Sequence, residues 1–318
     1  MKLYIDDGST NIKLAWNDNG QRRNLLSPNS FKAEWSAPFG QNRPSNYTLD
    51  GVHYSFDPIS ASTIRTTHTQ YQYSDTNVIG IHHALLQTGL SPQPVNIEVT
   101  LPLSEYFDGN NQPNMDNINR KKRNVMRAVQ LNGGDTFAIK SVRVMPESIP
   151  AGFERLSQMN EMQSLLIVDL GGTTLDIALV RGQMSGITKV YCDPFIGVSI
   201  MTDAISAVLA ANNMRTSSLV ANDIILHRHD DNWLRSRLQN TAHYMQVVGT
   251  LEEKEETLKQ RVKNALSEFT DFTDVLIVGG GAEIVAPAVQ EVCGGHAHVS
   301  KSEAPQFALV NGLYILGE

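Results

Sequence analysis

Cysteine is nearly absent from the sequence, whose 318 residues include only Cys192 and Cys293. Two cysteines cannot form the disulfide framework of a small secreted domain, so we expect a reducing, cytoplasmic environment. The first residues show none of the charged, apolar and cleavage regions of a signal peptide. Long apolar runs are missing too, and none approaches the ~20 residues that span a bilayer. We therefore expect a soluble protein with no membrane partner.

A large excess of either charge is also absent. The sequence has 26 Lys and Arg against 33 Asp and Glu, which gives a net charge of −7. A surface that grips nucleic acid tends to be basic, so direct nucleic-acid binding is not expected. The G-x-x-x-x-G-K-[ST] motif of P-loop ATPases and the G-x-S-x-G motif of serine hydrolases are missing. The histidines lack partners at metal-ligand spacing, which argues against a zinc site.

What the sequence does contain is one short pattern that occurs twice. Residues 1–16 read MKLYIDDGSTNIKLAW, and residues 165–180 read LLIVDLGGTTLDIALV. The positions that match are Asp6 with Asp169, Gly8 with Gly171, and Thr10 with Thr173. Each copy predicts a β-hairpin, with an apolar strand, a carboxylate, a turn of small residues and a second apolar strand. The offset of 163 residues is close to half the chain, which indicates a duplicated domain with two turns facing across a cleft.

The carboxylates in this pattern end strands that are otherwise apolar. Burying one of them without a partner would cost several kcal/mol, so a cation is expected opposite Asp6 and Asp169. One copy alone would indicate an ordinary Asp-Gly hairpin. The pair, with glycine and hydroxyl residues whose backbone N–H groups can converge on an anion, predicts a magnesium–nucleotide site. Lys13 adds a charge for a phosphate oxygen, although a solvated strand lysine explains its spacing equally well.

Two further segments fit the same cleft. Glu147 follows an apolar strand that ends at Pro146, where it could orient a water for attack on a γ-phosphate. A glutamate favoured by a helix dipole is an equally good explanation of that position. Near the end of the chain, the glycines 279–281 follow a buried strand and precede a helix that starts near Ala282. They predict an adenosine or α-phosphate contact, and a tight strand-to-helix turn is the alternative.

The rest of the chain predicts a scaffold. Helical and strand patterns alternate, which indicates an α/β fold whose antiparallel hairpins belong to mixed sheets. Residues 74–86 predict a helix with its N-cap at Ser74 or Asp75 and a stop at Gly89, and residues 95–101 predict a strand. The basic run at residues 120–123 is interpreted as a solvated helix face in preference to a polyanion patch.

Taken in order, the motifs DDGSTNIK, MPESIPAG, LGGTTLDI and VGGGAE resemble the nucleotide site of the superfamily of actin, heat-shock chaperones and sugar kinases. The closest likeness is to the ParM (StbA) family of actin-like ATPases, and the stretches LNGGDTF, SPNSFK and TLPLSEY extend it over the whole chain. The resemblance implies a duplicated actin-like (ribonuclease H-like) ATPase fold with two domains and four subdomains. The implied first domain spans residues 1–160, has an outer subdomain at 31–75 and is completed by 305–318. The second spans 161–304, with an outer subdomain at about 196–271.

The resemblance also implies a function and a set of site residues. ParM-like proteins polymerise with ATP and Mg²⁺ into dynamic filaments that segregate low-copy plasmids, and a ParR-like adaptor bound to centromeric plasmid DNA captures the filament ends. By position, Asp6 and Asp169 would serve the metal through water, and Glu147 would join them in catalysis by positioning the attacking water. The nucleotide would contact Gly8, Ser9, Thr10, Asn11, Lys13, Gly171, Gly172, Thr173, Thr174, Gly279, Gly280, Gly281 and Ala282. The choice between ATP and GTP, the filament geometry and the adaptor surface stay open.

Two alternatives use the same cleft. A phosphotransferase similar to sugar or acetate kinases would need a second-substrate pocket with an acidic base, and the sequence offers no candidate for one. A chaperone-like ATPase would need a separate peptide-binding domain, and 318 residues leave no room for one beside two nucleotide-binding halves.

Overall fold

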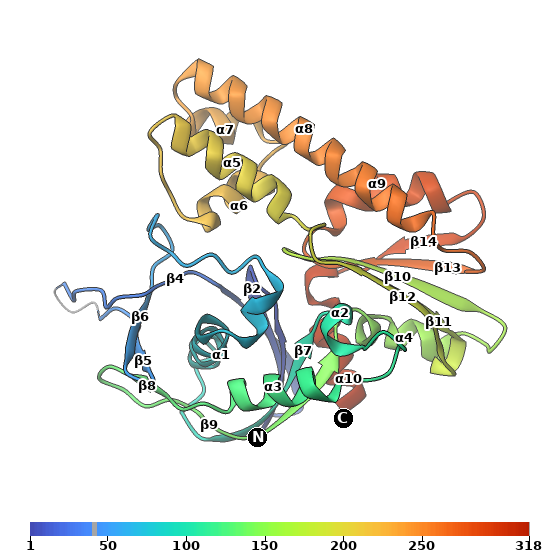
Figure 1. Ribbon diagram of the computed structural model, residues 1–318, viewed down its shortest axis with the longest axis horizontal. Coiled ribbons are helices and arrows are strands. Elements are labelled where there is room, and N and C mark those ends of the chain that lie inside the picture. Colours follow the sequence, from blue (N-terminus) through green and yellow to red (C-terminus); the bar gives the residue numbers. More distant parts are fainter. Residues whose placement is uncertain (40–42, 318) are drawn as a thin grey trace.

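The computed structural model describes residues 1–39 and 43–317 (Figure 1). Residues 40–42, within the expected outer subdomain 31–75, and residue 318, at the end of the expected segment 305–318, lie outside the described residues.

Two five-stranded sheets with the same strand order form the centre of the molecule. The first sheet contains, in spatial order, β3 (Gln21–Pro28), β2 (Asn11–Asp18), β1 (Lys2–Asp7), β7 (Pro94–Leu101) and β9 (Ala138–Pro146). The second contains β12 (Ile187–Asp193), β11 (Leu175–Arg181), β10 (Ser164–Leu170), β13 (Asp274–Val278) and β14 (His298–Lys301). In each sheet the first three strands along the chain form an antiparallel meander, and the last two run parallel to the first. The expected duplication and the α/β fold with mixed sheets are therefore confirmed.

The twin hairpins lie where the repeated pattern predicts them. In the first, Asp6 lies opposite Lys13, and in the second, Asp169 lies opposite Asp176. The apolar residues of β1 and β10 are buried on both faces of each strand, because helices cover both faces of each sheet. The strands therefore read as nearly continuous apolar runs that end at a carboxylate.

The helices that cover the two large sheets tie the two halves of the molecule together. They are α1 (Asp75–Gln87), α3 (Met115–Val125), α4 (Phe153–Gln158), α5 (Ser199–Ala211), α8 (Thr241–Leu266), α9 (Ala282–Cys293) and α10 (Ala308–Gly317). Helices α5, α8 and α9 pack on one face of the second sheet, and α4 packs on its other face. Helix α10 returns to the first sheet, where Tyr314 packs edge-on against Tyr4 with ring centroids 5.4 Å apart.

The outer parts of the molecule flank this centre (Figure 1). A small sheet has the spatial order β4 (Phe31–Lys32), β6 (Val52–Phe56), β5 (Asn46–Leu49) and β8 (Val129–Leu131). The short helices are η1 (Thr69–Tyr73), α2 (Leu103–Tyr106), η2 (Ile149–Gly152), η3 (Gly182–Met184), α6 (Ser218–Leu226), α7 (Asp231–Arg237) and η4 (Pro305–Phe307). Figure 1 places the small sheet at one end and helices α5 to α8 along the upper edge. The domain limits expected from the sequence stay a prediction.

One expectation about the scaffold is wrong. The basic run at residues 120–123 lies on α3, but it is not a uniformly solvated face, because the Lys121 side chain is fully buried and forms an ion pair with Asp7. Its partner is 114 positions away in the sequence, so no local pattern could reveal it. Over the described residues, no helix has both the length and the apolarity that crossing a membrane requires.

A glycine in α10 tests how closely the last helix packs on the rest of the chain. Any side chain at Gly312 would overlap the backbone carbonyl of Pro150 in η2. We expect Gly312→Ala to lower the free energy of unfolding by about 1–3 kcal/mol, since backbone cannot yield as a flexible side chain can.

The matched control is Gly249→Ala in the exposed middle of α8, where an added methyl group meets nothing within 4 Å. There alanine should raise the free energy of unfolding by about 0.5–1 kcal/mol, because alanine has fewer backbone conformations than glycine in the unfolded chain. Urea titration of both variants measures the difference, and equal stabilities would contradict the close packing of α10.

Candidate functional site

A cavity of about 740 Å³, counted to its open mouth, lies where the two hairpin turns meet. The residues expected from the sequence that line it are Asp6, Gly8, Ser9, Thr10, Asn11, Lys13, Glu147, Asp169, Gly171, Gly172, Thr173, Thr174, Gly279 and Gly280. Gly281 and Ala282 do not line it. Gly281 packs against Leu170, and Ala282 is buried at the start of α9.

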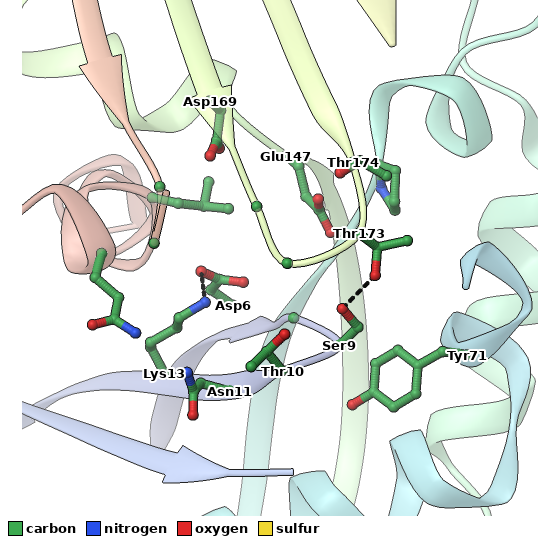
Figure 2. Close-up of a pocket in the computed structure, with 18 of the residues that line it drawn as sticks. Asp6, Ser9, Thr10, Asn11, Lys13, Tyr71, Glu147, Asp169, Thr173 and Thr174 are labelled. Atoms are coloured by element: carbon green, nitrogen blue, oxygen red, sulfur yellow. Dashed lines mark hydrogen bonds and ion pairs between the residues drawn. The ribbon is translucent and has the colours of Figure 1, made fainter. Parts of the chain in front are cut away.

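The two turns touch each other. Ser9 Oγ and Thr173 Oγ1 share a hydrogen bond of 2.6 Å, although the residues are 164 positions apart (Figure 2). Gly172 lies so close to Thr10 that a side chain at position 172 would overlap the threonine hydroxyl. Glycine is required here for the close approach of the turns, and a hydroxyl group from each half faces the same point.

The second turn is fixed from behind by α5. The amides of Val198 and Ser199 donate to the carbonyl groups of Gly171 and Gly172, at 3.1 and 2.8 Å. The turn also closes on itself, because the Gly171 amide donates to the Thr174 carbonyl at 2.9 Å. These bonds hold the turn carbonyls away from the cavity, which suits a turn that presents donors to an anion.

The third glycine segment has a different geometric role. Gly279 has a φ of +89°, in the left-handed region that glycine adopts without strain. A side chain there would overlap a carboxylate oxygen of Asp169, and the Gly279 amide donates to the carbonyl of Pro305 at 2.9 Å. The chain therefore passes flat against the carboxylate at the cavity wall before α9 begins.

Three acids face the cavity, and burial raises the pKa of each. The pKa of Asp6 is raised by burial, against the effect of Lys13, whose ammonium lies 3.1 Å from its carboxylate. Burial and the charges of Asp176 and Asp6 raise the pKa of Asp169 to about 7. Burial and the same neighbouring carboxylates raise the pKa of Glu147 well above its ordinary value.

The cation expected opposite Asp169 is only partly supplied by the protein. Its carboxylate accepts a hydrogen bond of 3.2 Å from the neutral hydroxyl of Ser148, and Lys13 lowers its pKa only from a distance. Figure 2 shows Asp169 and Asp6 extending toward each other from the two hairpins, with Lys13 beside Asp6. One lysine against three acids leaves the cavity with an excess of negative charge.

This excess fits a hydrated divalent cation. A bound cation would lower the pKa of each facing acid, and Mg²⁺ keeps several of its waters when it binds carboxylates. In the part of the chain that the structure describes, no three or more His, Cys, Asp or Glu side chains lie close enough to hold a metal directly. Asp6 and Asp169 are the cavity carboxylates that could hold such an ion through its waters.

Several cavity residues were not predicted from the sequence. They are His68, Thr69, Tyr71, Gln72, Pro102, Pro305, Gln306 and Leu309. The first four come from η1 and the residue before it, inside the outer subdomain expected at residues 31–75. Tyr71 is fixed by its hydroxyl group, which accepts a 2.6 Å hydrogen bond from Asn29. No local signal marks η1 as part of a site, because its place depends on packing against distant strands.

A further buried acid, Asp176, lies opposite Asp169 on β11. It accepts a hydrogen bond of 2.9 Å from the Leu103 amide at the start of α2, and burial raises its pKa. This bond joins a helix next to the first sheet to a strand of the second. Asp176 therefore connects the two halves below the cavity and adds to its negative charge.

Comparison with known proteins identifies the family. A family model described as "Plasmid segregation protein ParM, N-terminal" matches residues 1–158, and one described as "Plasmid segregation protein ParM, C-terminal" matches residues 159–316. No curated protein matches the chain significantly.

Among solved structures, the chain is similar to three that show its fold. An archaeal actin homologue, Ta0583, is 17% identical with a TM-score of 0.71. A non-polymerisable quadruple mutant of pCBH ParM is 14% identical with a TM-score of 0.74, and a 15-stranded ParM filament from Clostridium botulinum is 14% identical with a TM-score of 0.72. Each match covers 99% of this chain and 98% of the other. The actin-like fold is therefore shown over the described chain.

The crowding of acids predicts a stability gain from removing one of them. The Asp169 carboxyl keeps its proton up to about pH 7 when folded, whereas the unfolded residue ionises near its ordinary value of 3.8. The free energy of unfolding therefore has its full value below pH 3.8. It falls as the pH rises from 3.8 to 7, by roughly 4 kcal/mol in total, because the carboxyl ionises first in the unfolded chain. We expect Asp169→Asn to stabilise the ligand-free protein at pH 8, by up to about that amount, and not at pH 4.

Urea titrations at both pH values measure this difference. Asp135→Asn, at an exposed carboxyl far from the cavity, should leave the stability nearly unchanged at each pH. A destabilised Asp169→Asn protein at pH 8 would show that the carboxylate is satisfied without a ligand.

Proposed function

The chain belongs to the family of the plasmid segregation protein ParM, and from that membership we propose that it is an actin-like ATPase. In this proposal it binds ATP with Mg²⁺ in the cavity between its halves and assembles into dynamic filaments that move plasmid DNA. A DNA-bound adaptor of the ParR type captures the filament ends. The observation that carries the proposal is the cavity itself, where the acids and turns of both hairpins meet.

Solved structures of similar proteins support two parts of the proposal, nucleotide binding and self-assembly. One structure of the archaeal actin homologue Ta0583 is a complex with ADP, and its match to this chain has a TM-score of 0.67. Filaments are described for the ParM of Clostridium botulinum, for AlfA of a Bacillus subtilis plasmid and for Alp12. Shared fold and family support nucleotide binding and self-assembly here, with ATP proposed over GTP from the family resemblance.

The proposed site residues divide by their place in the cavity. Asp6 and Asp169 hold the hydrated metal ion, whose charge would stabilise the phosphates. The residues proposed for the phosphates are Gly8, Ser9, Thr10, Asn11, Lys13, Gly171, Gly172, Thr173 and Thr174. Gly279 and Gly280 lie on the nucleoside side, and Gly281 and Ala282 support them by shaping the turn. The proposed domains keep the limits expected from the sequence.

Closure of the cleft is the proposed link between nucleotide and assembly. The hydroxyl groups of Ser9 and Thr173 meet at the point where a γ-phosphate would receive donors from both turns. Two more contacts join the outer parts, an ion pair of 2.5 Å between Arg65 and Asp203 and a 2.6 Å hydrogen bond from Ser217 to the Pro58 carbonyl. A γ-phosphate that contacts both turns stabilises the closed state over the open one. Hydrolysis removes this contact, so the closed state loses its advantage.

Glu147 is the proposed water-positioning residue. It is half-buried directly after β9, and its carboxylate lies at the cavity wall facing the turn of the second hairpin (Figure 2). An ionised carboxylate there can accept a hydrogen bond from the attacking water and align it with the phosphorus. The Mg²⁺ ion that binds with ATP would favour the ionised form of Glu147.

Right-angle light scattering after addition of ATP and Mg²⁺, together with phosphate release, tests the proposal. We expect scattering to rise and decay in the wild type. In Glu147→Ala, scattering should rise and persist, while phosphate release slows by about a hundredfold or more, since water positioning is lost.

Glu154→Ala, at an exposed glutamate on α4, is the control and should release phosphate at the wild-type rate. Phosphate release at the normal rate in Glu147→Ala would rule out the assigned role. Turnover that requires a sugar or carboxylate, without any scattering, would favour the phosphotransferase alternative.

A further inference from the structure

Lys121 is an unusual residue for the interior of this protein. Its side chain is fully buried on α3, where an unpaired ammonium group would be very costly. Its three N–H donors match three acceptors, which are a carboxylate oxygen of Asp7, Oε1 of Gln72 and, at 3.0 Å, Oδ1 of Asn77. Lys121 does not line the cavity, so the proposed site does not explain it.

Asp7 is held by several donors on the side of β1 away from Asp6. Its oxygens accept from the Thr100 amide at 2.9 Å, the Thr100 hydroxyl at 3.3 Å and the Asn77 side chain at 2.7 Å, besides Lys121. Successive residues of a strand point to opposite faces, so Asp6 faces the cavity while Asp7 faces the core. The ion pair is thus anchored rigidly behind the site.

Gln72 connects this ion pair to the cavity. Its Oε1 faces Lys121, and its Nε2 donates to Oε1 of Glu147 at 3.4 Å. A lysine ammonium group can only donate hydrogen bonds, so the amide must turn its oxygen toward Lys121. The amide N–H groups are then fixed toward Glu147, which as a carboxylate can only accept. The Thr100 hydroxyl adds a weaker contact to Glu147 at 3.5 Å.

We propose that Lys121 and Gln72 are positioning residues for hydrolysis, with the buried ammonium fixing the Gln72 amide and the amide fixing the Glu147 carboxylate. This inference rests on the proposed function of Glu147. It adds a chain of contacts that runs from α3 through η1 to the cavity wall. The position of a water bound by Glu147 would then depend on Glu147 itself and, through the Gln72 amide, on Lys121.

A purely structural role for Lys121 makes a different prediction. If the lysine only neutralises Asp7, then removing both charges together should restore normal behaviour. If it also orients Gln72, the neutral pair should restore folding but not hydrolysis. The double variant Asp7→Asn, Lys121→Met therefore separates the two roles, and it avoids the unpaired carboxylate that could unfold Lys121→Met alone.

Steady-state ATP hydrolysis and melting temperature are measured for Gln72→Met, for the double variant and for Lys122→Met as the matched control on the same helix. We expect kcat to fall about tenfold or more in the first two, because a misplaced water reacts slowly, while KM for ATP changes less than twofold. Melting temperatures of these two variants should fall by a few degrees, because each variant leaves a buried polar group unpaired, but every variant should stay folded at the assay temperature. Lys122, which is partly exposed, should tolerate the same substitution without a change in kcat.

A wild-type kcat in either Gln72→Met or the double variant would overturn the inference. Combining Gln72→Met with Glu147→Ala gives a second check, since the pair should be no slower than Glu147→Ala alone if Gln72 acts through Glu147. An additional loss in that pair would show an independent role and contradict the proposal. Absence of ATP hydrolysis in the wild type would instead defeat the proposed function, so the two failures are distinguishable.

Discussion

Five buried or half-buried carboxyl groups gather where the two hairpins meet, and their mutual repulsion shapes the site around them. Asp6, Glu147 and Asp169 face the cavity, and Asp7 and Asp176 lie directly behind it. Two lysines in the described chain pair with or face them, Lys13 inside the cavity and Lys121 in the core. Self-repulsion of this kind is tolerated in a folded protein when a ligand supplies the missing positive charge.

The two halves are joined at the base of the cavity and also touch at its turns. Helices α4 and α10 each pack on the sheet of the opposite half, and the Leu103 amide binds Asp176 at the base of the cavity. At the cavity the halves meet through few polar contacts, of which the Ser9–Thr173 hydrogen bond is one. The base is therefore held largely by apolar packing, whereas the turns meet through a hydroxyl contact between the halves.

The core behind the site is organised to hold charges in fixed places. Asp7 receives four hydrogen bonds, and Lys121 donates three, so neither group has freedom to turn toward solvent. A fully satisfied polar network of this kind is rigid, because breaking any one bond leaves a buried group unpaired. Glu147 accepts a hydrogen bond from Gln72 in this network and also lines the cavity, so it connects the network to the cavity.

Sequence patterns alone predict the twin hairpins, the strand-to-helix turn at Gly279 and the approach of Asp6 and Asp169 to a shared cleft. These follow from local rules, since strand periodicity and small turn residues act over a few positions and the repeat is visible at a fixed offset. Only the tertiary structure decided that Lys121 is buried and that Tyr71 and Gln72 reach the cavity. Those placements depend on contacts between residues tens to more than a hundred positions apart, and a lysine in a basic helical run looks the same whether its partner is water or a distant aspartate.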